Sequence, residues 1–209
     1  MPPRLGDGRV RKIVLASRNQ HKIAELAELL ADLGLTIVPV PAEAPAVVED
    51  GETFQANAAK KAETIAAYTQ EWALADDSGL EVDFLGGKPG VYSARFAGED
   101  ASDAENNAKL LALLKDVPPA ERGAQFRSVI ALARPGQPTI FVEGTCRGVI
   151  ATEARGFNGF GYDPLFYLPE LGKTFAELTP EEKNRISHRA VAMAKLKEVL
   201  AEILSGADC

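Results

Sequence analysis

The chain has 209 residues, of which 46% are hydrophobic and 25% charged, and its formal net charge is -7. This length and composition predict one globular domain, or one domain with two lobes, with a sizeable core. The acidic balance and the lack of a long basic run disfavour nucleic acid as a partner, because neutralising its phosphates requires clustered Lys and Arg.

Cys146 and Cys209 lie far apart and form no CxxC motif, so the sequence predicts neither a zinc site nor a disulfide framework. This cysteine usage fits a reducing cytosol. The polar start, MPPRLGDGRVRK, is not typical of a signal peptide, and no apolar run approaches the length that spans a bilayer. We therefore expect a cytoplasmic protein without a membrane segment.

The first predicted strand, residues 12–16, is followed by a short polar loop and a helix that ends at Gly34. Unpaired N–H groups and the positive end of the helix dipole make such a junction a candidate anion site. Ser17 and Asn19 supply donors, and Lys22 supplies a cation. The alternative interpretation is that Asn19 serves only as the N-cap.

A second strand is predicted at residues 35–38, and an acidic loop, residues 49–52, precedes a helix over residues 53–68. Asn57 and Lys61 are four residues apart, so they share a neighbouring face of that helix. Acidic residues before a helix are ordinarily explained by favourable interaction with its dipole. If this loop packs beside Asp77, two carboxylates from separate segments could share a metal ion.

The segment around residues 73–79 predicts a short buried strand that ends in two carboxylates, Asp76 and Asp77, followed by a turn at Ser78 and Gly79. Strand side chains alternate in direction, so at most one of the two carboxylates faces a given site. Carboxylates in such a position suit Mg²⁺, which prefers hard oxygen ligands. The alternative is a solvated turn, since these residue types are common in turns.

The next segments predict ordinary elements. Tight turns at residues 86–90 require glycine, and a capping box at Ser102 opens a helix to about residue 115. The β-rich segments 126–133 and 140–150 predict an antiparallel hairpin. We interpret Cys146, on the second of these strands, as a small core residue rather than a nucleophile.

Residues 156–168 interleave glycine with aromatic residues, which lets the backbone approach a flat ligand while a ring stacks on it; a buried aromatic loop is the alternative. Thr179 then opens a predicted helix that runs to Leu204. The basic residues in its first part, including His188, form a solvated face if considered in isolation, and a lone His is more often structural than catalytic.

Five blocks occur together in one order: SRNQHK (17–22), ETFQANAAKKA (52–62), ADDSGLEVDFLGGKPGVYSARFAG (75–98), GFGYDP (159–164) and TPEEKNRISHR (179–189). In this combination the chain strongly resembles the inosine/xanthosine triphosphate pyrophosphatases, from residue 12 to about residue 200. The resemblance implies an α/β fold, elongated and two-lobed around a mixed β-sheet with flanking helices, and an active site in the cleft between the lobes. One domain over residues 1–209 is expected, with residues 1–11 as an extension.

The resemblance also implies Mg²⁺-dependent hydrolysis of ITP, dITP and XTP between the α and β phosphates, and a homodimer. It implies that Asp77 is the catalytic acid/base and, with Glu49, a metal ligand. The implied substrate-binding residues are Ser17, Arg18, Asn19, Gln20, His21, Lys22, Lys61, Ser78, Phe160, Gly161, Tyr162, Asp163, Lys183, His188 and Arg189. The N–H groups of Arg189 only donate, so we expect them to favour a 6-oxo over a 6-amino purine.

Two alternatives remain open at this point. One is a nucleotide-binding module without turnover, which the acidic cluster disfavours because carboxylates repel phosphates unless a metal is recruited. The other is a general nucleotide phosphatase or a kinase, and the absence of a GxxxxGK[ST] motif disfavours the kinase.

Overall fold

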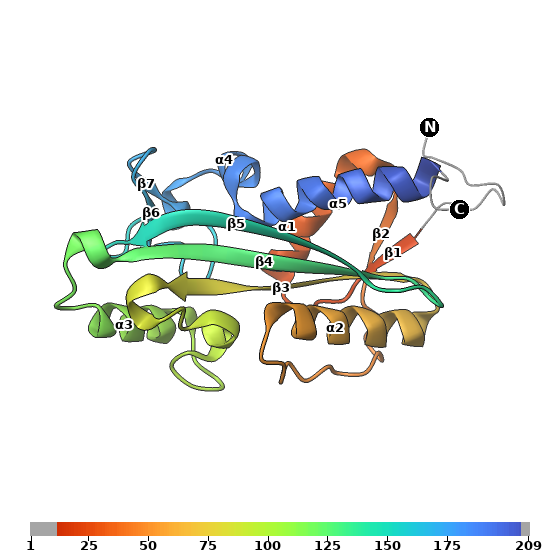
Figure 1. Cartoon of the computed structure of the whole chain (residues 1–209), viewed down its shortest axis with the longest axis horizontal. Coiled ribbons are helices and arrows are strands. Elements are labelled where there is room, and N and C mark those ends of the chain that lie inside the picture. Colours follow the sequence, from red (N-terminus) through yellow and green to blue (C-terminus); the bar gives the residue numbers. More distant parts are fainter. Residues whose placement is uncertain (1–11, 206–209) are drawn as a thin grey trace. The chain divides into compact units, whose positions relative to one another are not determined.

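The computed structural model describes residues 12–205, which form one mixed β-sheet with flanking helices (Figure 1). Its strands lie in the order β2-β1-β3-β4-β5-β6-β7. Strand β1 is parallel to both β2 and β3, whereas β6 is antiparallel to both β5 and β7. The predicted α/β class with a mixed sheet is confirmed.

The strands are β1 (Lys12–Leu15), β2 (Thr36–Pro39), β3 (Trp72–Val82), β4 (Gly123–Ala133), β5 (Ile140–Ile150), β6 (Phe166–Leu168) and β7 (Lys173–Thr174). The α-helices are α1 (Gln20–Leu30), α2 (Phe54–Thr69), α3 (Asp103–Leu113), α4 (Pro180–Ile186) and α5 (His188–Ser205). Most predicted boundaries agree with these to within one or two residues, because the N-caps were correctly recognised. The first helix was expected to end at Gly34, but α1 ends at Leu30 and a 3₁₀ turn over Ala31–Leu33 connects it to Gly34.

The described chain divides into two compact units. Unit 1 comprises residues 12–77, 128–144 and 189–205, and unit 2 comprises residues 78–127 and 145–188. Strands β3, β4 and β5 each contribute residues to both units. The elongated shape, the cleft and the single domain over residues 1–209 stay predictions, and the extension 1–11 lies outside the described residues.

In unit 1, helices α1 and α5 cover one face of the strands and α2 covers the other (Figure 1). Leu26 and Leu30 of α1 pack with Met193, Leu196 and Leu200 of α5 on the apolar side chains of β1, β3 and β4. The apolar faces of these two helices therefore face the core, and their burial stabilises the unit by about 25 cal/mol per Å² of apolar surface.

In unit 2, the core is rich in aromatic rings. Phe126, Phe166 and Phe175 are in mutual contact, with the Phe126 and Phe166 ring centroids 4.6 Å apart. Leu110 and Leu114, at the end of α3, complete the same cluster. A capping box at Ser102 begins α3, as predicted from the sequence.

Strand β3 corrects one prediction. Asp76, Asp77, Ser78 and Gly79 were expected to end a short strand and turn the chain, but β3 continues through them from Trp72 to Val82. These residue types usually indicate a turn. Here the charges of both Asp side chains are balanced by nearby cations, so the two residues can lie inside a strand. The prediction of a turn is wrong, whereas the prediction that Asp76 and Asp77 have different surroundings is confirmed.

The C-terminal helix corrects a second prediction. It was expected to run unbroken from Thr179 to Leu204, but Ser187 is extended, with ψ at 159°, and separates α4 from α5. Serine competes with helical hydrogen bonding, which makes a break less costly at this residue than at an alanine or leucine. Unit 2 ends and unit 1 resumes immediately after this break, between His188 and Arg189.

Among residues 12–205, no helix has both the length and the apolar character needed to cross a membrane.

Candidate functional site

The junction between β1 and α1 has the predicted order of strand, loop and helix, with Asn19 as the N-cap, and anion binding there stays a prediction. Asn19 caps α1, with its Oδ1 accepting a hydrogen bond from the backbone N–H of Lys22 at 3.2 Å. The hydroxyl of Ser17 accepts one from the N–H of Asn19, and Arg18 donates to the carbonyl of Ala44 at 2.7 Å. Gln20 and His21 are exposed in the first turn. The junction is therefore an ordered helix N-terminus at the surface of unit 1.

This junction lies at the same end of the parallel strands as the two carboxylates. Leu15, the last residue of β1, pairs with Leu74 of β3, and β3 reaches Asp76 and Asp77 two and three residues further on. Ligand sites in α/β proteins form preferentially at the carboxyl ends of parallel strands. The topology thus places the carboxylates just past the end of β1.

Asp76 is the centre of a buried charge network. Its side chain is 0% exposed, and Oδ2 lies 3.0 Å from Lys22 Nζ and 3.4 Å from Arg189 Nε. The hydroxyl of Ser128 donates to Oδ1. Burial on its own would raise the pKa of Asp76, but Lys22 and Arg189 outweigh it and hold that pKa far below the ordinary value. Asp76 therefore stays ionised and fixes both cations.

Asp77 faces a different set of groups. Lys61 Nζ lies 3.3 Å from Asp77 Oδ1 and 3.1 Å from Glu49 Oε2, and it donates to the backbone carbonyl of Asp76 at 2.9 Å. Lys61 is buried, although the sequence alone presents it as a residue on a helix face. Two carboxylates from separate segments thus converge on one ammonium group, so the acidic loop does pack beside Asp77, and the sharing of a metal ion by Glu49 and Asp77 stays a prediction.

The two carboxyl groups have opposite pKa shifts. Burial raises the pKa of Asp77 to about 6, and the negative charge of Glu49 adds to this effect while Lys61 and Lys22 oppose it. For Glu49, which is more exposed, burial is outweighed by Lys61 and by the hydrogen bond with Asp77, so its pKa lies below the ordinary value. Of the two carboxyl groups, Asp77 is therefore the one that binds a proton first as the pH falls toward 6.

The donor set of this cluster fits Mg²⁺. Asp77 Oδ2 is buried and meets no hydrogen-bond donor among the described residues, and carboxylate oxygens are the ligands Mg²⁺ prefers. Within residues 12–205 no group of three or more His, Cys, Asp or Glu could hold a metal ion. Two carboxylates are few ligands for a metal ion, but Mg²⁺ is usually held by one or two carboxylates and retains several water molecules; Mg²⁺ binding by Glu49 and Asp77 stays a prediction.

In unit 2, residues 159–163 form a tight loop around one carboxylate. Asp163 Oδ2 accepts hydrogen bonds from the backbone N–H of Phe160 at 3.0 Å and from Lys183 Nζ at 2.7 Å. Gly159 has φ at 73°, and a Cβ there would lie 2.0 Å from Asp163 Oδ2, so glycine is required. Lys183 Nζ also lies 5.1 Å from the Phe160 ring centroid. Phe160, Asp163 and Lys183, all predicted site residues, thus contact one another.

The neighbouring predicted residues have structural contacts. Gly161 donates its N–H to Asp103 Oδ2 at 2.7 Å. Tyr162 is 4% exposed within the core of unit 2, and its hydroxyl donates to the carbonyl of Ser93. Phe160, only partly buried, is therefore the more accessible ring for stacking on a ligand. Substrate binding by Gly161 and Tyr162 stays a prediction.

The last predicted residues flank the break between α4 and α5. His188 is buried and stacks on Phe126, with ring centroids 4.8 Å apart. The Arg189 guanidinium is 4% exposed and bonds Glu25 at 2.8 Å as well as Asp76. Ser78 lies half-buried on β3. These contacts give His188 and Arg189 structural partners, and their contact with substrate stays a prediction.

Cys146 agrees with its interpretation as a packing residue. It is partly buried against the core of unit 2, and burial raises the pKa of its thiol to about 11. At neutral pH the thiol is protonated, so it is a poor nucleophile.

Comparison with known proteins assigns this arrangement to a family. Residues 13–199 match the Ham1 family. The chain belongs to the Ham1 family. A relative from Desulforamulus reducens, named dITP/XTP pyrophosphatase, is 57% identical over 90% of this chain and 95% of its own length. One of the same name from Geobacillus kaustophilus is 53% identical over 94% of this chain and 98% of its own.

Solved Ham1 structures share the fold. A HAM1 protein from Coxiella burnetii matches with a TM-score of 0.85 at 46% identity, covering 92% of this chain and all of that one. A structure from Mycobacterium abscessus, titled nucleoside-triphosphatase / dITP/XTP pyrophosphatase, matches with a TM-score of 0.72 at 47% identity, covering 88% of this chain and 98% of that one.

Three residues of this Ham1 chain were not identified as site residues from the sequence. Glu25 accepts a hydrogen bond from Arg189, and Ser128 donates one to Asp76. Asn57 accepts a hydrogen bond from the backbone of the acidic loop, at Gly51. Ser128 directly precedes the apolar end of β4, residues 129–133, and the structure buries it completely, where a hydroxyl requires a polar partner. Glu25 follows Lys22 by one helical turn and resembles an ordinary surface acid in the sequence.

Proposed function

We propose that this chain hydrolyses non-standard purine nucleoside triphosphates, ITP, dITP and XTP, to the nucleoside monophosphate and pyrophosphate. The observation that supports this most directly is the convergence of Glu49 and Asp77 on Lys61. Asp77 lies on β3, three residues beyond Leu74, which pairs with the last residue of β1. Relatives that are more than half identical over nine tenths of the chain bear the name dITP/XTP pyrophosphatase.

In this proposal the cations of unit 1 receive the triphosphate. Residues 17–22 offer the N–H groups of a helix N-terminus, and Lys22 and Lys61 act as point charges toward phosphate oxygens. In the protein alone both ammonium groups are held by carboxylates. Their positions are thus fixed before substrate binds, which reduces the entropy lost on binding.

Asp77 is proposed to accept a proton from the attacking water. A general base works best when its pKa lies near the operating pH, and a pKa of about 6 leaves Asp77 mostly ionised at pH 7 to 8 while it still binds a proton well. Lys61, which donates to Asp77 Oδ1, would hold this carboxylate in place.

Glu49 and Asp77 would hold Mg²⁺, which when bound supplies positive charge against the phosphate oxygens. The buried Oδ2 of Asp77, with no donor among the described residues, supports this assignment. In the metal-free protein, burial and the charge of Glu49 both disfavour the ionised form of Asp77 and raise its pKa to about 6; a bound cation would favour that ionised form.

For the purine base we propose the loop of unit 2. Phe160 would stack on the ring, while Lys183 and Asp163 fix the loop through their 2.7 Å contact. Gly161, Tyr162, Asp163, Ser78, His188 and Arg189 are kept as proposed substrate-binding residues on the family resemblance. Arg189 would bond the 6-oxo group that distinguishes hypoxanthine and xanthine from adenine.

The family resemblance also leads us to propose a homodimer and a cytoplasmic location. Cysteine usage fits a reducing compartment.

A substrate panel tests the proposed activity. Purified protein is incubated with ITP, XTP and ATP, each with Mg²⁺ and each with excess chelator. We expect turnover of ITP and XTP with Mg²⁺, little turnover of ATP, and none in chelator. Binding of ITP without turnover would instead identify a nucleotide-binding module, and full activity in chelator would contradict the metal proposal.

A further inference from the structure

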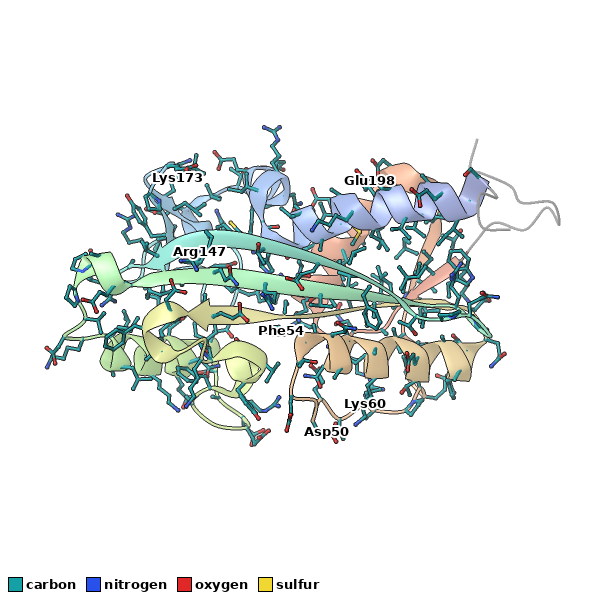
Figure 2. All side chains as sticks on the ribbon, in the orientation of Figure 1. Asp50, Phe54, Lys60, Arg147, Lys173 and Glu198 are labelled. Carbon is teal, nitrogen blue, oxygen red and sulfur yellow. The ribbon has the colours of Figure 1, made fainter. Side chains whose placement is uncertain are left out.

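The loop between β2 and α2 has no strand or helix of its own, yet it carries Glu49. This loop, residues 40–52, is instead held by side chains from other segments of the chain. Arg18 binds the carbonyl of Ala44 near the start of the loop. The rest is held by α2, whose side chains at positions 57, 60 and 61 contact loop residues 51, 50 and 49 in turn. Figure 2 shows Lys60 and Asp50 on the side of α2 that faces the loop.

These three contacts differ in strength. Lys60 and Asp50 lie 2.7 Å apart but their side chains are 44% and 67% exposed, so the pair contributes little. Glu49 has a 41% exposed side chain, so packing does not fix it. Asn57 is 1% exposed, and its Oδ1 accepts a hydrogen bond from the N–H of Gly51 at 2.7 Å. The buried contact is therefore the one that anchors the loop.

The contact of Asn57 with Gly51 leaves no room for a side chain at position 51. A Cβ on Gly51 would lie 2.6 Å from Asn57 Oδ1 and 3.0 Å from the Cβ of Ala56. The Asn57 Nδ2 group also reaches the Gly51 carbonyl, at 3.5 Å. The side-chain amide of Asn57 thus hydrogen-bonds both the N–H and the carbonyl of Gly51, which lies two residues after Glu49 in the chain.

We infer that Asn57 is a positioning residue for Glu49: by binding Gly51 it holds the acidic loop so that the Glu49 carboxylate points at Lys61 and Asp77. This inference rests on the proposed function, because the proposed function assigns Mg²⁺ to Glu49. Asn57 itself touches neither the ion nor the substrate. Groups that orient a metal ligand typically affect metal affinity by about 10–100-fold.

Three variants test the inference. Asn57→Ala removes the anchor from the helix, and Gly51→Ala displaces the loop without removing a buried polar side chain. Lys60→Ala is the matched control, since it removes the exposed loop contact on the same helix. Mn²⁺ binding to each substrate-free protein is titrated by electron paramagnetic resonance, and melting curves in chelator verify folding. The Mg²⁺ dependence of pyrophosphate release from ITP is measured in parallel.

We expect Gly51→Ala and Asn57→Ala to bind Mn²⁺ about 10-fold or more weakly than wild type, and Lys60→Ala to stay within about twofold. The Mg²⁺ concentration for half-maximal activity should rise by a similar factor, with kcat at saturating Mg²⁺ changed little. Wild-type Mn²⁺ affinity in a folded Gly51→Ala protein would overturn the inference and leave the proposed function standing. A wild-type protein that neither binds Mn²⁺ nor releases pyrophosphate would overturn both.

Discussion

Asp76 and Asp77 are adjacent in sequence and both buried, but the fold uses them in opposite ways. Asp76 has two cations and a hydroxyl group around it, and its pKa is lowered. Asp77 shares Lys61 with a second carboxylate, and burial raises its pKa. Because strand side chains alternate in direction, neighbouring residues reach different surroundings. Asp76 is therefore held ionised between its cations, whereas Asp77 has the raised pKa that the proposed general base requires.

Replacing Asp77 by Asn should make the metal-free protein more stable at high pH. The pKa of Asp77 is raised from 3.8 to about 6, so the fold favours the protonated carboxyl group. That stabilisation is complete below the unfolded value and is lost as the pH rises through about 6. Asn resembles the protonated form at every pH. In chelator, Asp77→Asn should melt above wild type at pH 8, with the difference shrinking toward pH 5.

The same variant should lose at least about 100-fold in kcat, because the proposed base is removed. If Asp77→Asn melts at a lower temperature than wild type at pH 8 in chelator, the ionised form of Asp77 does not destabilise the fold, which would contradict the prediction.

Replacing Asp76 by Asn should instead destabilise the protein. The substitution leaves Lys22 and Arg189 without their shared carboxylate, and removing one partner of a buried ion pair costs about 3–5 kcal/mol. Urea unfolding followed by circular dichroism measures this loss. Asp76→Asn with wild-type stability would mean that the network around Asp76 contributes nothing to folding.

Replacing Arg189 by Ala tests base recognition and structure together. If Arg189 bonds the 6-oxo group, kcat/KM should fall much further for ITP than for ATP, and the ratio between them should narrow. Because Arg189 also pairs with Asp76 and Glu25, melting curves are required alongside the kinetics. An equal fall for both substrates, in a protein of reduced stability, would assign Arg189 to the fold alone.

At the scale of elements, the helix starts were predictable because their signals are local. The capping boxes at Ser102 and Thr179 each place the acceptor and the Glu three residues apart, and both are present as predicted. The end of β3 and the continuity of the last helix were not predictable in the same way. Whether Asp76 and Asp77 end a strand depends on cations from α1, α2 and α5, which a local pattern does not contain.

The same limit applies to the candidate site. The junction at residues 17–22 is a local strand–loop–helix pattern and was found from the sequence. Asn57 was recognised only as a neighbour of Lys61, because its partner is a backbone group rather than a side chain. Ser128 lies 52 residues from Asp76, and no spacing rule connects a hydroxyl on one strand with a carboxylate on another.

Removing the cap of α3 should cost about 1 kcal/mol. Ser102→Ala deletes the hydroxyl that accepts from the Glu105 N–H, whereas Ser102→Asp keeps an acceptor there. Chemical denaturation should therefore show a loss for the alanine variant that the aspartate variant largely recovers. Equal losses in the two variants would mean that side-chain volume, not capping, determines stability at this position.

At the scale of the whole molecule, the proposed homodimer is a prediction that mass measurement tests. Light scattering at micromolar concentration should give about twice the 22.3 kDa mass of the chain. A monomer mass under these conditions would contradict the proposal.

The central claim is that the chain cleaves between the α and β phosphates, and the products decide it. ³¹P nuclear magnetic resonance of a reaction of wild-type protein with ITP and Mg²⁺ distinguishes the alternatives in one spectrum. We predict inosine monophosphate and pyrophosphate as the initial products, with no diphosphate intermediate. Orthophosphate together with inosine diphosphate would identify a phosphatase and contradict the account.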